Sequence, residues 1–102
     1  MFIRALSGSS GGNGYDLDNI SAGSNSGSLP FNMTCNVGDI IIAWGRGASN
    51  YKTIPANNTG VLKYNVAGDD VLSVIEASAT TVRLKEQNSL ALSVSTIVIP
   101  KA

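Results

Sequence analysis

Three side chains near the middle of the chain have the types and spacing of a sugar-binding site. Trp44 ends an apolar run that begins at Ile40, and Arg46 and Tyr51 follow it closely. Aromatic rings can stack on the apolar faces of sugars, and an arginine can donate hydrogen bonds to hydroxyl groups. If the chain has a glycan-binding site, we therefore expect it at Trp44, Arg46 and Tyr51. The alternative, which we favour, is that Trp44 caps the core, because an indole at a strand end needs only one partner for its N–H.

The chain lacks the side chains on which most acid–base and metal-dependent catalysis depends. It contains no histidine and a single cysteine, Cys35, which falls on the apolar face of an expected strand. A thiol in such a place packs as a small hydrophobic group. The seven carboxylates show no spacing that singles out a pair for glycoside hydrolysis. We therefore expect a protein that is not an enzyme.

Two short segments resemble ligand-binding loops, but each lacks a residue that its loop pattern requires. The glycine-rich residues 8–14 contain no lysine, which a phosphate-binding loop requires. Asp16 and Asp18 begin a calcium-loop pattern, but Ile20 stands where the next oxygen ligand belongs. The sequence thus predicts no cofactor and no metal site.

The chain is short and electrically neutral. Its 102 residues suffice for one domain, and its 43% of hydrophobic residues suffice for one core. Seven basic residues balance seven acidic ones, so the positive excess that nucleic-acid binding requires is missing. Charged residues make up only 14% of the chain, so copies of it repel one another little, which is compatible with self-association.

The sequence shows no feature of a membrane or secretory protein. No segment approaches the roughly 18 apolar residues that a membrane-spanning helix needs. The apolar start, residues 1–6, is too short for a signal peptide and runs at once into a polar segment. We therefore expect synthesis in the cytoplasm without a signal peptide.

Alternating apolar and polar residues predict an all-β fold. Leu29, Phe31, Met33 and Cys35 fall on one face of a strand whose other face is polar. Further strands are expected over residues 51–54, 61–66, 71–78, 80–85 and 90–99, with turn residues between them. The pattern favours an antiparallel, jelly-roll-like β-sandwich with at most one helical turn, and a barrel remains the alternative.

The junctions between these strands carry further predictions. Val37–Gly38–Asp39 is an expected turn, and it leads into Ile40–Trp44, which reads as a central strand covered on both faces. Residues 45–50 are expected to form a loop. Residues 80–99 are expected to form a hairpin that turns at residues 86–89.

The first residues differ in composition from the rest. Residues 1–14 combine a short apolar segment with a Gly/Ser-rich run, which predicts an N-terminal arm attached to one β-sandwich domain of residues 15–102. If the arm pairs with a neighbouring copy, Phe2, Ile3 and Leu6 are its assembly residues. The alternative is a frayed terminus.

The opening residues 1–12 and the Val37–Gly38–Asp39 junction resemble small structural proteins of tailed phages and prophages of Gram-positive bacteria, including fibre and decoration modules. The strand pattern is also similar, more distantly, to trimeric jelly-roll modules of the tumour-necrosis-factor type. These resemblances imply a virion component of the tail, fibre or head surface. Its partners would be copies of itself, as a homotrimer or another homo-oligomer, and other virion proteins. Host attachment through a cell-surface glycan is the alternative role.

Overall fold

The computed structural model describes residues 14–22, 29–87 and 93–102, with the backbone alone for residues 47–51, 69 and 93. These ranges form eight strands and one 3-10 turn, Leu17–Asn19. The strands are β1 (Ser21–Ala22), β2 (Phe31–Thr34), β3 (Ile40–Tyr51), β4 (Thr53–Pro55), β5 (Gly60–Val66), β6 (Gly68–Ala77), β7 (Thr81–Glu86) and β8 (Ser93–Ile99). No helix in this part of the chain is long and apolar enough to cross a membrane.

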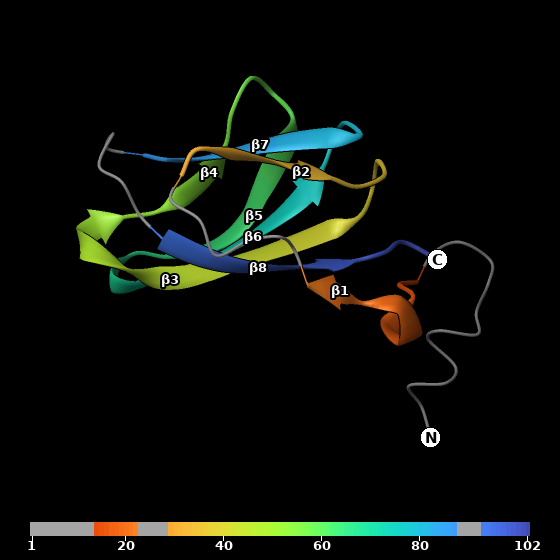
Figure 1. The fold of residues 1–102 in the computed structure, drawn as a ribbon, viewed down its shortest axis with the longest axis horizontal. Coiled ribbons are helices and arrows are strands. Elements are labelled where there is room, and N and C mark those ends of the chain that lie inside the picture. The colour runs from red at the N-terminus through yellow and green to blue at the C-terminus, as the bar shows by residue number, and fades with distance from the viewer. Residues whose placement is uncertain (1–13, 23–28, 88–92) are drawn as a thin grey trace.

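The strands form two antiparallel sheets that pack face to face (Figure 1). The larger sheet has the order β1-β8-β3-β6-β5, and the smaller has the order β2-β7-β4. The predicted all-β sandwich is therefore confirmed, and the sheets are separate rather than closed into a barrel. A jelly-roll connectivity and the domain boundary after residue 14 stay predictions.

The predicted hairpin over residues 80–99 is wrong. Strand β7 pairs with β2 and β4 in the smaller sheet, whereas β8 pairs with β1 and β3 in the larger one. The chain therefore passes from one sheet to the other between these strands, across residues 88–92, which lie outside the described ranges. Periodicity did not reveal this because it reports which residues share a face, not which strand lies alongside.

The core lies between the inner faces of the two sheets. The alternation predicted for Leu29 to Cys35 is confirmed, since Leu29, Met33 and Cys35 are buried and Phe31 packs against them. Opposite them, the larger sheet contributes Ile41 and Ile75, both with no exposed surface. The other buried apolar residues of this cluster are Ala43, Val71, Ala77, Val82, Leu84, Val94 and Val98.

The turn before β3 is fixed by a buried carboxylate. Asp39 is only 3% exposed, and its two oxygens accept backbone N–H bonds from Asn36 at 2.8 Å and from Lys101 at 2.9 Å. The neighbouring Gly38 has a φ of +95°, a conformation that favours glycine. The predicted Val37–Asp39 turn is thus confirmed, and it ties the start of β3 to the end of the chain.

Strand β3 differs from its prediction in two ways. It continues to Tyr51, so the expected loop over residues 45–50 is wrong, although its register with β6 shifts between Arg46 and Tyr51. It is also covered on one face only: Ile41 and Ala43 are fully buried, whereas Trp44 is 40% exposed. The smaller sheet packs on one side of the larger sheet, and no described element covers the other side (Figure 1).

Candidate functional site

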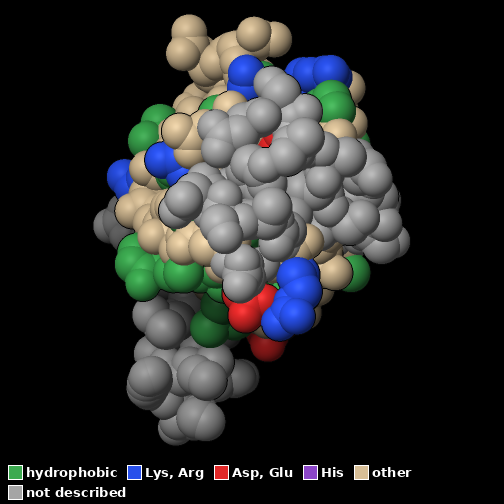
Figure 2. Space-filling model, turned by 90° about the vertical axis from the view of Figure 1, so that its left-hand side faces the viewer, with side chains coloured by type: hydrophobic (Ala, Val, Ile, Leu, Met, Phe, Trp, Pro, Cys, Tyr) green, Lys and Arg blue, Asp and Glu red, His purple; other side chains and the backbone are tan. Residues whose placement is uncertain are grey.

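The uncovered side of the larger sheet, which we call the outer face, is mostly apolar. Side chains on one face of a sheet are those at directly paired positions, so the strand register identifies its members. Its apolar members are Ala22, Ile40, Ile42, Trp44, Val61, Tyr64, Val66, Leu72, Val74, Ile97 and Ile99. Four of them, Trp44, Val61, Tyr64 and Val66, are between 40% and 59% exposed. In the end view of Figure 2, hydrophobic side chains gather along the lower part of the molecule, on the side of the larger sheet.

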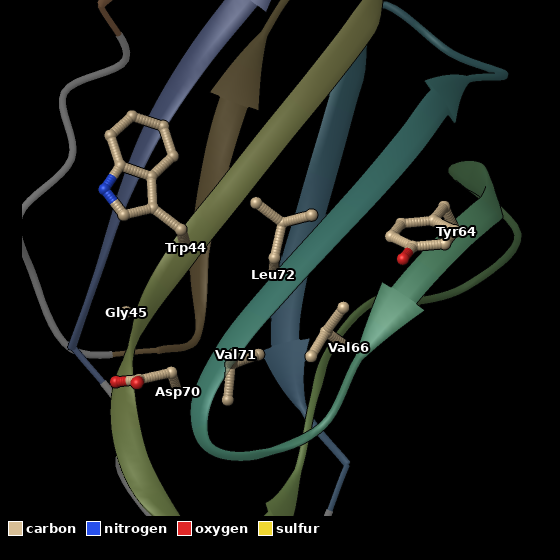
Figure 3. A pocket seen from close by; sticks show the side chains of 7 residues that line it. All are labelled: Trp44, Gly45, Tyr64, Val66, Asp70, Val71 and Leu72. Carbon is tan, nitrogen blue, oxygen red and sulfur yellow. The ribbon is translucent and has the colours of Figure 1, made fainter.

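An open hollow of about 540 Å³ lies within the outer face. Trp44 from β3 and Tyr64 from β5 stand on either side of Leu72 from β6 (Figure 3). The lining consists of Trp44, Gly45, Tyr64, Val66, Asp70, Val71 and Leu72. Asp70 is the one charged residue among them, so the hollow suits an apolar group better than a strongly polar one.

Two ion pairs flank the apolar centre of the outer face. At one end, Arg46 Nε lies 3.2 Å from Asp70 Oδ1, with both side chains more than three-quarters exposed. Towards the other end, Lys63 Nζ lies 3.5 Å from Glu76 Oε1. Each cation has an anion beside it, so these four side chains add no net charge to the outer face. Pairs as exposed as these contribute at most about 1 kcal/mol to stability.

The opposite side of the sandwich is polar. On the side of the smaller sheet that faces away from the core, the register aligns Asn32 with Arg83 and Thr34 with Thr81, and all four are exposed. Lys85 continues this row. Of the two outer surfaces that the described strands form, only that of the larger sheet is apolar.

The structure brings two of the three predicted ligand-binding residues to this surface. Trp44 and Arg46 are alternate residues of β3 and share the outer face. The interpretation of Trp44 as a cap on the core is therefore wrong, since its side chain projects away from the core. Tyr51 ends β3 beyond the register shift, and its side chain lies outside the described part of the structure. The predicted assembly residues Phe2, Ile3 and Leu6 also lie outside it.

Sequence reasoning missed Tyr64, Val66 and Leu72. A signal was present, because the second face of the strand at residues 71–78 carries the apolar pair Leu72 and Val74. A half-buried strand would show polar residues there. This indicates a sheet that is apolar on both sides.

The described residues also bear on the metal-binding and nucleophilic groups considered from the sequence, and the one cysteine is buried. None of them form a group of three or more potential metal ligands. Burial, with the Asp39 carboxylate, raises the pKa of the Cys35 thiol, which donates to the Ala79 carbonyl at 3.4 Å.

Comparison with protein-family models, with curated proteins and with solved structures finds no match to this chain. The function of this chain is therefore inferred from its outer face.

Proposed function

We propose that this chain is a non-enzymatic structural subunit that self-associates, as a tail, fibre or head-decoration component of a phage-like particle. The observation that carries the proposal is the exposed apolar outer face. Monomeric soluble proteins rarely expose a contiguous apolar patch of more than a few hundred Å², and larger ones mark interaction sites. In a subunit of an assembly, such a face would be buried against a neighbouring subunit.

Other features of the chain support the same role. The net charge is zero and histidine is absent, which suits a protein that works through shape and surface. The resemblance of residues 1–12 and of the Val37–Gly38–Asp39 junction to phage structural proteins is our reason for proposing that the assembly is a phage-like particle. Other virion proteins would be its neighbours there, at the particle surface.

Light scattering on the purified protein tests the proposal. We expect a particle mass that is a multiple of the 10.5 kDa of one chain and that rises with concentration. A mass of one chain at every concentration, up to millimolar protein, would contradict it.

A carbohydrate-binding or host-attachment module is the second candidate. The hollow between Trp44 and Tyr64 favours it, because two aromatic rings flank a space with Arg46 and Asp70 at its margin. Sugar hydroxyls need several polar partners, however, and the two charged groups at this margin already pair with each other. Binding on a glycan array that disappears in Trp44→Ala, with an unchanged circular dichroism spectrum, would establish this candidate in place of the first.

A further inference from the structure

We infer that two copies of this chain pack outer face against outer face around a two-fold axis. The hollow between Trp44 and Tyr64 of each copy is then closed by apolar side chains of the other. This inference rests on the proposed function, since it names the partner and the surface through which the subunit associates.

The apolar centre and charged margins of the outer face match the anatomy of an interface. The central rows of the register contain Ile42 with Val74 and Trp44 with Leu72, and the ion pairs lie towards the two ends. Protein interfaces likewise have a centre depleted of charge, enriched in aromatic residues and surrounded by a polar rim. Because each charge is paired within its own chain, a second copy meets no net repulsion.

The sheet edges are poorly suited to association. The edge strands β1, β4 and β2 have only two, three and four residues, and β4 ends at Pro55. The longest exposed edge, β5, has a register shift at Lys63, and a bulge with a lysine is a common device that blocks edge-to-edge pairing. Copies of this chain therefore meet through a face rather than by extending a sheet.

The distribution of polarity favours a two-fold pair over a ring. A ring of three or more copies needs two different patches that complement each other, whereas a two-fold axis uses one patch twice. Among the described strands only the larger sheet has an apolar outer surface, and Thr81, Arg83 and Lys85 make the other one polar and basic. Of the homotrimer and the other homo-oligomers expected from the sequence, the inference thus selects a dimer.

The size of the outer face sets the expected affinity. Four strands about 4.8 Å apart and seven residues of about 3.3 Å rise give a flat footprint of roughly 440 Å² per copy. Two flat footprints of this size bury roughly 900 Å². Because side chains project from the sheet, the accessible surface that is buried rises to about 1,000–1,200 Å², the lower limit of specific interfaces. We therefore expect a concentration-dependent dimer with a dissociation constant on the order of micromolar.

A matched pair of charge substitutions tests the inference. Val66→Glu places a carboxylate on the outer face, and Thr81→Glu places one on the polar surface of the smaller sheet. Both replace an exposed β-branched residue. In sedimentation equilibrium we expect wild type and Thr81→Glu to form dimers of twice 10.5 kDa, and Val66→Glu to bind at least tenfold more weakly. Tyr64→Lys is the second variant if Val66→Glu fails to fold by circular dichroism.

The fluorescence of Trp44 gives an independent measurement of dissociation, because Trp44 is the only tryptophan in the chain. Its fluorescence should shift to longer wavelength as the wild-type protein is diluted, since dissociation exposes the indole to water. Thr81→Glu should show the same shift, and Val66→Glu should show the long-wavelength emission at all concentrations.

The outcomes separate this inference from the proposed function. A wild-type protein that is monomeric throughout overturns both, and quenching of its Trp44 emission by a sugar would assign the hollow to a glycan instead. An oligomer that Val66→Glu and Tyr64→Lys leave intact overturns only the interface. A mass of three chains, or Trp44 emission that does not change on dissociation, overturns the two-fold pair while self-association stands.

Discussion

Replacing Asp39 by asparagine should destabilise the fold strongly, although it only exchanges one carboxylate oxygen for an NH₂ group and removes one negative charge. The two Asp39 oxygens accept N–H groups from different parts of the chain, Asn36 in the turn and Lys101 near the end. Asparagine offers one oxygen, so its amide NH₂ would face one of these N–H donors. The side chain is 3% exposed, so water cannot replace the lost acceptor.

The structure sets the size of this effect. One hydrogen bond to a charged group is lost, which costs about 1.5–3 kcal/mol, and the remaining bond becomes a weaker, neutral one. We expect a total loss of about 3 kcal/mol in the free energy of unfolding. For a chain of this length that corresponds to a fall in Tm of roughly 15 °C.

Thermal unfolding followed by circular dichroism measures this effect, with Asp70→Asn as the matched control. Asp70 also pairs with another part of the chain, Arg46, but its side chain is 76% exposed. The control should therefore lose less than about 1 kcal/mol. If Asp39→Asn unfolds within about 3 °C of Asp70→Asn, the assignment of Asp39 as the group that fixes this turn is wrong.

Three further perturbations have expected outcomes. Leu84→Ala should cost about 3 kcal/mol in denaturant unfolding, because Leu84 is fully buried and a cavity would remain; a loss below about 1 kcal/mol would refute the packing. Gly60→Ala should cost about 1–3 kcal/mol, since its Cβ would stand 2.8 Å from Ile75 Cγ2, and an unchanged Tm would contradict that contact. The pKa of Cys35 is raised by burial and by Asp39, so the unfolded chain loses this proton first. Stability should therefore fall above about pH 9 in wild type and not in Cys35→Ala; parallel pH profiles would argue against it.

The local alternation of the sequence predicted the class of fold and much of the core. Leu29, Met33 and Cys35 are buried as their spacing indicated, and the turn at Val37–Asp39 is where its residues placed it. These features are local, because successive side chains of a strand point to opposite faces whatever the strand pairs with.

Strand pairing required the tertiary structure. The alternation in β7 and β8 is compatible with one hairpin, yet the strands belong to different sheets. Partner choice depends on contacts between residues far apart in the chain, and no local pattern encodes them.

The candidate site followed from the same long-range arrangement. The sequence identified Trp44 and Arg46 of β3 as residues of interest. It could not place Tyr64 of β5 and Leu72 of β6 beside them, because strand pairing brings these three strands together. It also could not show that the apolar run Ile40–Trp44 has only one covered side. That depends on how many layers pack on the larger sheet, and the tertiary structure shows that, among the described strands, a single layer does.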